Sequence, residues 1–126
     1  MLFRSDKPFV WWVKEPLDLA RMQQAAAALT GFADFRSFTD DDPDEKSTEV
    51  LLTSLTLSAE PPLIVVRVSG SHFLWKMVRR LVGVLVEVGR GGLAPGDMPA
   101  LLASRSELPA KLTAPASGLF LERVDY

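Results

Sequence analysis

The sequence contains no cysteine and a single histidine, and these scarcities exclude several kinds of chemistry. Without cysteine there is no disulfide, no zinc site built on thiolates and no cysteine nucleophile, and this composition fits a reducing cytoplasm. One histidine cannot form a histidine-rich metal site. With neither thiolates nor a histidine cluster, we expect no metal. No apolar run approaches the roughly 18–20 residues that span a bilayer, so we also expect no membrane partner.

The overall composition is that of an ordinary globular protein. The chain has 126 residues, of which 48% are hydrophobic and 24% are charged. This length suits one compact domain, so we predict a single domain over residues 1–126. The chain starts almost directly on a bulky segment with Trp11 and Trp12, whose rings need neighbours on both sides. We therefore expect this domain to be incomplete.

The charges are segregated along the chain, although the net charge is only −2. Residues 34–49 hold seven acids and two bases, whereas residues 67–90 hold five bases and one acid. Local fields, rather than the total charge, attract a polyanion. The second segment is therefore the candidate for contact with a polyanion, and the acids at 40–44 read as a solvated loop.

Periodicity and breaker residues predict six main elements. These are strands at 9–13, 48–57, 63–68 and 119–124, a helix from the N-cap Asp18 to Gly31, and a longest helix from Ser71 or His72 to about Val88. A short helix is expected at 96–102. This order predicts an α+β fold in which helices pack on one face of a mostly antiparallel sheet.

The longest predicted helix has two different faces. Its apolar face carries Leu74, Met77, Val78, Leu81, Val82, Leu85 and Val88, and the opposite face carries His72, Lys76, Arg79, Arg80 and Gly83. The second face is either a solvated cationic surface or an anion site, since Lys76 and Arg80 are one turn apart, a spacing that suits neighbouring phosphates. Gly83 would let another backbone approach closely.

Arg79 lies toward the edge of the polar face, beside more apolar positions. A partly desolvated guanidinium there needs a carboxylate or phosphate partner. His72 is more typical of a helix start than of a catalyst. We expect no dyad with Ser71, because adjacent side chains diverge at a helix start.

Three segments, taken together, resemble a known family. They are SHFLWKMVRRLVG at 71–83 with VEVGRG at 86–91, GFADFRSF at 31–38, and TAPASGLFL at 113–121. In order and spacing they resemble the C-terminal signature of the TruA-type tRNA pseudouridine synthases, over nearly the whole chain.

The resemblance implies an isomerase that converts uridine to pseudouridine in the anticodon arm of tRNA, without cofactor or metal. It implies that Arg79 pairs with the family's catalytic Asp. By the same match, the substrate pocket would be lined or supported by Phe73, Leu74, Met77, Gly118 and Leu119. The candidate tRNA contacts are His72, Lys76 and Arg80. The complete enzyme is expected to be a homodimer.

The departures from the family pattern are also informative. The segment that carries the family's catalytic Asp has no counterpart in these 126 residues, so we predict a C-terminal portion that is inactive without the missing N-terminal portion. Ala33, Glu49, Trp75, Lys76 and Ser117 stand where the family often has other residues.

Two other functions stay open: a non-catalytic RNA-binding module that keeps the fold, and an interaction domain whose basic helix meets an acidic protein. We also expect self-association through an uncapped sheet edge.

Overall fold

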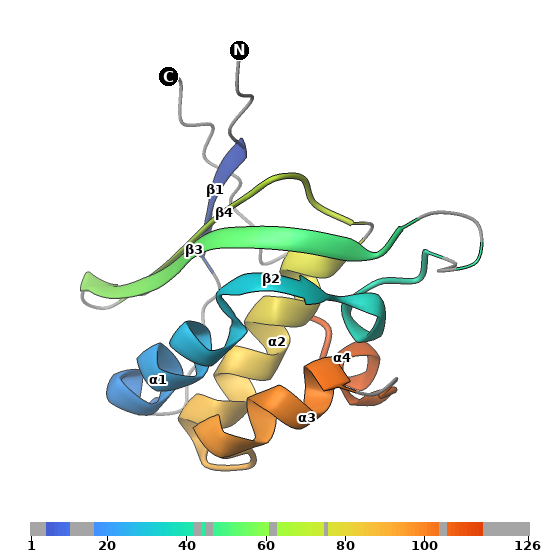
Figure 1. Ribbon diagram of the computed structural model, residues 1–126. Coiled ribbons are helices and arrows are strands. Elements are labelled where there is room, and N and C mark those ends of the chain that lie inside the picture. Colours follow the sequence, from blue (N-terminus) through green and yellow to red (C-terminus); the bar gives the residue numbers. More distant parts are fainter. Residues whose placement is uncertain are drawn as a thin grey trace.

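The structure is a computed structural model, and it describes residues 5–10, 17–41, 44, 47–60, 63–74, 76–103 and 106–114. Four antiparallel strands form one sheet in the order β1-β4-β3-β2. Their bounds are β1 Ser5–Val10, β2 Gly31–Asp34, β3 Glu49–Glu60 and β4 Leu63–Gly70. The described helices gather on one face of this sheet (Figure 1), so the predicted α+β fold class is confirmed.

In the ranges that the structure describes, the helical layer consists of four α-helices and two short 3-10 helices. The α-helices are α1 Leu19–Leu29, α2 Met77–Arg90, α3 Met98–Ala103 and α4 Leu108–Lys111, and the 3-10 helices are η1 Arg36–Phe38 and η2 Pro95–Asp97. α2 crosses beneath the sheet, with α1 on one side and η1 and α4 on the other (Figure 1).

The core forms between the sheet and the helices because β3 alternates buried and exposed residues. Val50 and Leu52 are buried, and a bulge between Leu52 and Ser54 then shifts the alternation so that Leu55 and Leu57 also face the helices. Because the bulge adds one residue to β3, the buried positions change from even to odd residue numbers, and the apolar side chains stay on the face that meets the helices. Leu29 of α1 joins the same buried cluster.

The start of α1 follows the sequence prediction. The Asp18 side chain accepts a hydrogen bond from the Arg21 backbone N–H, with an N···O distance of 3.2 Å, so Asp18 is the N-cap. The Asp18 N–H in turn donates to the carbonyl of Gly89 over 2.9 Å. The beginning of α1 is thereby tied to the end of α2.

The predicted start of the longest helix is wrong: α2 begins at Met77, not at Ser71 or His72. The Ser71 N–H donates to the Leu51 carbonyl, and the Leu51 N–H donates to Ser71 Oγ, so residue 71 is bound to β3. Lys76 then takes a left-handed conformation with φ of 64°, which redirects the chain into α2.

Two further boundaries differ from the prediction. α1 ends at Leu29, and Gly31 begins β2, a four-residue strand that was not predicted and that pairs with β3. β1 covers 5–10 rather than 9–13, and only its backbone is described. The strand predicted at 119–124 lies outside the described residues, as do Trp11 and Trp12.

Candidate functional site at the start of α2

The predicted site residues that the structure describes gather where β4 leads into α2. They are His72, Phe73, Leu74, Lys76, Met77, Arg79 and Arg80. Gly118 and Leu119 lie outside the described residues. Two further residues reach this region from distant parts of the chain, namely Asp40 from the segment after η1 and Ala114 from the segment after α4.

Arg79 is half-buried and bonded to the backbone of Ala114. Its Nε–H donates to the Ala114 carbonyl oxygen over 2.9 Å, and the Ala114 N–H donates to the Arg79 carbonyl over 3.0 Å. Within the described part of the chain, no carboxylate pairs with Arg79. The guanidinium therefore has a fixed direction while its two terminal nitrogens keep their capacity to bind an anion.

Arg80 is not on an exposed cationic face, and that expectation is wrong. Its side chain is buried, with the whole residue only 5% exposed, and its Nη2 pairs with Asp40 Oδ1. Its Nε–H is buried and has no hydrogen-bond partner among the residues that the structure describes. A charge this deeply buried needs a partner of opposite sign, and Asp40 is that partner.

Asp40 also pairs with Lys76, whose Nζ lies 3.1 Å from Asp40 Oδ2. The hydrogen bond from Arg80, and secondly that from Lys76, hold the pKa of Asp40 below its ordinary value of 3.8, against a smaller opposite effect of burial. Asp40 is exposed, as expected for a solvated loop, but its carboxylate also partly neutralises the cations at the start of α2.

The pocket residues differ in depth. Leu74 and Met77 belong to the buried core, whereas Phe73 is half-buried and packs against it. Leu74 and Met77 are thus part of the packed core beneath this region, whereas Phe73 is partly accessible at the surface.

His72 and Ser71 contradict one expectation. Both are exposed, and Ser71 Oγ lies 3.1 Å from His72 Nδ1, so the two side chains meet instead of diverging. They can meet because residues 71–74 are not helical. Ser71 Oγ also accepts from the Leu51 N–H, which is a structural role.

Gly83 behaves as the sequence predicted, because another backbone crosses α2 directly against it. A Cβ added at Gly83 would overlap the carbonyl oxygen of Leu112 and would lie 3.2 Å from the backbone nitrogen of Ala114. The crossing chain is the segment Leu112–Ala114, which follows α4.

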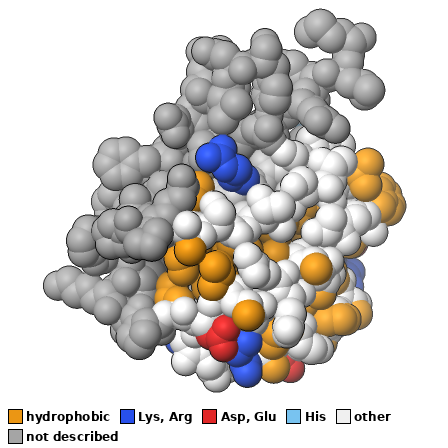
Figure 2. Space-filling view, turned by 90° about the vertical axis from the view of Figure 1, so that its left-hand side faces the viewer, with side chains coloured by type: hydrophobic (Ala, Val, Ile, Leu, Met, Phe, Trp, Pro, Cys, Tyr) orange, Lys and Arg blue, Asp and Glu red, His pale blue; other side chains and the backbone are white. Residues whose placement is uncertain are grey.

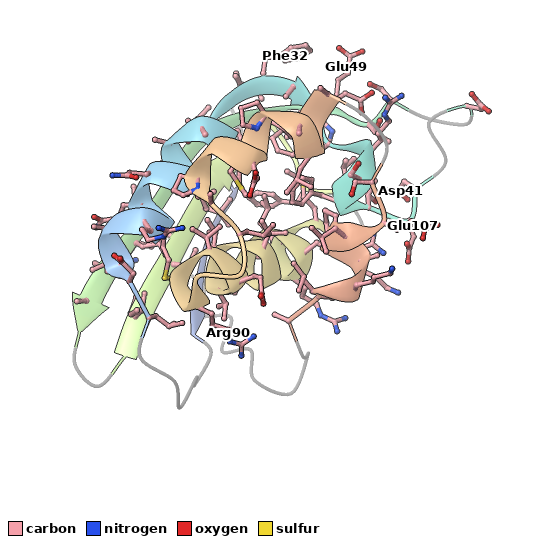
Figure 3. The ribbon with its side chains drawn as sticks, turned by 90° about the horizontal axis from the view of Figure 1, so that it is seen from below. Phe32, Asp41, Glu49, Arg90 and Glu107 are labelled. Carbon is pink, nitrogen blue, oxygen red and sulfur yellow. The ribbon has the colours of Figure 1, made fainter. Side chains whose placement is uncertain are left out.

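The bases of the segment 67–90 do not form one cluster, because Lys76, Arg79 and Arg80 lie at the start of α2, Arg67 lies on β4 and Arg90 is the last residue of α2. Asp41 and Arg90 lie toward opposite ends of α2 (Figure 3), and Arg90 pairs with Glu87. On the face seen in Figure 2, Lys and Arg side chains are few and separate. Among the described residues, no group of three or more His, Asp or Glu side chains is arranged to hold a metal ion, and the described helices are too short or too polar to cross a bilayer.

Sequence reasoning missed Asp40 and Ala114. Asp40 is one of several acids in a run, and nothing in its spacing points to a base 40 residues later. Ala114 lies within the third family-like segment, which was the only available signal, but its contribution comes from its peptide group rather than its side chain.

Comparison with known proteins agrees with the resemblance. A family model described as tRNA pseudouridine synthase matches residues 25–126. The tRNA pseudouridine synthase A of Moorella thermoacetica is 44% identical over 118 residues, covering 94% of this chain and 48% of the relative. That of Pelobacter propionicus is 42% identical, with 94% and 48% covered. That of Pseudothermotoga lettingae is 34% identical, with 100% and 54% covered. The chain thus spans about half the length of these relatives.

Proposed function

The chain belongs to the tRNA pseudouridine synthase family, and from this premise we propose that it supplies the arginine that holds the catalytic acid of such an enzyme. The reaction would convert uridine to pseudouridine in the anticodon arm of tRNA. The acid itself would be an Asp supplied from outside these 126 residues, because the family's acid-bearing segment has no counterpart here.

One observation carries this proposal: Arg79 is half-buried and oriented by Ala114, and no carboxylate of the described chain pairs with it. A partly desolvated guanidinium with two terminal nitrogens available is suited to a carboxylate, which it can bind through two parallel hydrogen bonds. Its neighbour Arg80 already has Asp40 as a partner and is therefore not suited to this role.

The chemistry explains why the acid needs such a partner. The bond between the base and the ribose breaks, the uracil turns, and a new bond forms through a carbon atom of the base. A carboxylate that takes part must be ionised near neutral pH although it is buried against the substrate. An adjacent Arg lowers the pKa of such a carboxyl group and fixes its orientation.

The tRNA backbone would contact the exposed side of the same region. We assign this role to His72, which is exposed, and to Lys76, which is half-buried and can exchange Asp40 for a phosphate. Arg80, the third candidate, would reach a phosphate only after Asp40 moves away. Such contacts add affinity but do not read the sequence of the RNA.

A flipped uridine requires a close-fitting apolar slot. We propose that Phe73 forms part of its wall, with Leu74 and Met77 behind it. Gly118 and Leu119 are assigned to the same pocket by family resemblance alone. The remaining partner of the chain would be the missing N-terminal portion, the complete enzyme would be a homodimer, and the proposed location is the cytoplasm.

The proposal is tested by measuring pseudouridine in a tRNA transcript. The purified chain alone should form none. Mixed with a polypeptide that carries the acid-bearing segment, it should form pseudouridine, and Arg79→Lys should lower the rate about a hundredfold, because Lys cannot hold a carboxylate in the bidentate geometry.

The matched control is Arg90→Lys, which makes the same change at the far end of α2, where Arg90 pairs with Glu87. This control should keep the wild-type rate. Equal rates for the Arg79 and Arg90 variants, or product from the chain alone, would contradict the proposal.

A further inference from the structure

Arg79 and the peptide of Ala114 are joined by two hydrogen bonds that run in opposite directions. Arg79 Nε donates to the Ala114 oxygen over 2.9 Å, and the Ala114 N–H donates to the Arg79 carbonyl over 3.0 Å. The first bond holds the side chain and the second holds the helix backbone from which that side chain projects. The guanidinium is therefore fixed relative to α2.

Gly83 allows the Ala114 peptide to come this close. It lies four residues after Arg79, one helical turn further along the same side of α2. A Cβ at this position would overlap the Leu112 oxygen and would lie 2.6 Å from the Leu112 carbonyl carbon. Both conflicts involve backbone atoms, which cannot rotate away as a side chain can. Any side chain at residue 83 would push Leu112–Ala114 off the helix.

The bond to Ala114 also determines which atoms of Arg79 remain for an anion. A guanidinium has five N–H donors, one of them on Nε. With Nε engaged, the four donors on the two terminal nitrogens remain, and no described residue accepts from them. A carboxylate can therefore approach end-on and bind both terminal nitrogens at once.

We propose that Gly83 is a positioning residue for Arg79. By admitting the Leu112–Ala114 backbone, it turns the terminal nitrogens of Arg79 toward the catalytic carboxylate, which binds them end-on. The identity of that carboxylate rests on the proposed function, whereas the orientation of Arg79 does not.

The orientation is tested by NMR on the 126-residue chain, by following the solvent exchange of the Arg79 Nε–H and of the Ala114 backbone N–H. Gly83→Ala should accelerate both at least about tenfold, because it opens the two bonds. Gly96→Ala is the matched control, since a Cβ there meets nothing within 4 Å. Unchanged exchange in Gly83→Ala would overturn the inference.

A second variant keeps the test decisive if Gly83→Ala does not fold. Arg79→Lys removes the Nε donor without adding bulk at residue 83. Because Gly83 is intact and the Ala114 N–H is bonded to the main-chain carbonyl of residue 79, exchange of this N–H should change less than about twofold. A roughly tenfold acceleration would overturn the inference, since the Arg79 side chain and not Gly83 would then hold the crossing chain against α2.

Turnover then separates this inference from the proposed function. With the acid-bearing polypeptide present, Gly83→Ala should lower kcat about tenfold while KM for tRNA stays within about twofold, because the tRNA contacts are untouched. A normal kcat together with accelerated exchange would overturn the positioning role. Absence of product from the wild-type mixture would overturn the proposed function, and the exchange rates would still decide how Arg79 is held.

Discussion

Arg79 is half-buried and bonds a peptide carbonyl, whereas the adjacent Arg80 is buried and bonds a carboxylate. The sequence alone distinguished them only by their angle on an assumed helix, and this angle indicated Arg79 as the residue that needs an acid partner. It gave no sign that Arg80 would be covered. The partner Asp40 lies 40 residues earlier, and only the folded chain brings the two together.

The pairing of Asp40 predicts a pH-dependent contribution to stability. Because Arg80 and Lys76 lower the pKa of Asp40, the contribution is complete above the ordinary value of 3.8 and is lost as pH falls through the lower folded value. At neutral pH, Asp40→Asn should lower the free energy of unfolding by about 1 kcal/mol, a modest figure because the carboxylate is partly exposed.

Urea denaturation at several pH values between 7 and 2.5 measures this difference. The gap between wild type and Asp40→Asn should narrow as the solution becomes acidic. Asp44→Asn removes an exposed acid from the same loop and is the matched control for loss of one negative charge. A gap that stays constant down to the lowest pH would rule out the ion pairs as its source.

Among the elements, α2 shows which features of a helix hydrophobic periodicity predicts and which it does not. The apolar face was predicted correctly, since Met77, Leu81 and Leu85 are all in the core. The opposite face was expected to be either a solvated cationic surface or an anion site, with room for another backbone at Gly83. Beyond Arg80 this face is covered by α4 and by the chain that crosses at Gly83. Periodicity describes one helix at a time and does not reveal what packs on its second side.

The N-cap of α1 gives a prediction about the stability of a single helix. Asp18→Ala removes the acceptor for the Arg21 N–H and should destabilise the chain by about 1 kcal/mol, within the usual range for such caps. Thermal unfolding followed by circular dichroism measures the loss.

Gln24→Ala is the control for that experiment, because it shortens an exposed side chain within α1 without touching either end. It should change stability little, since Ala and Gln have similar helix propensities. Equal losses in the two variants would mean that Asp18 does not act as a cap.

At the scale of the whole molecule, β2 lies at one end of the described sheet. It carries Phe32, the most exposed large hydrophobic residue among those whose side chains the structure describes. Phe32 is 68% exposed and pairs in register with Leu51, which is 43% exposed. Phe32 points away from the molecule (Figure 3). An edge strand with apolar side chains is a site where chains associate.

We therefore expect the chain to self-associate and Phe32→Lys to weaken that association. Burying one Phe contributes about 1.5–3 kcal/mol, so the dissociation constant should rise about tenfold or more. Sedimentation velocity over a dilution series measures it. Thr56→Lys, which adds the same charge at an exposed position of β3, should have little effect, and an equal effect would point to charge repulsion alone.

The order of the strands in the sheet also has a consequence for synthesis on the ribosome. Val10 of β1 pairs with Val65 of β4, which is made 55 residues later, whereas β3 and β4 follow each other directly. At roughly 5–20 residues per second, β1 leaves the exit tunnel about 3–11 s before its neighbour. During that interval β1 is without its partner β4, and the β3–β4 hairpin is the template to which β1 is later added.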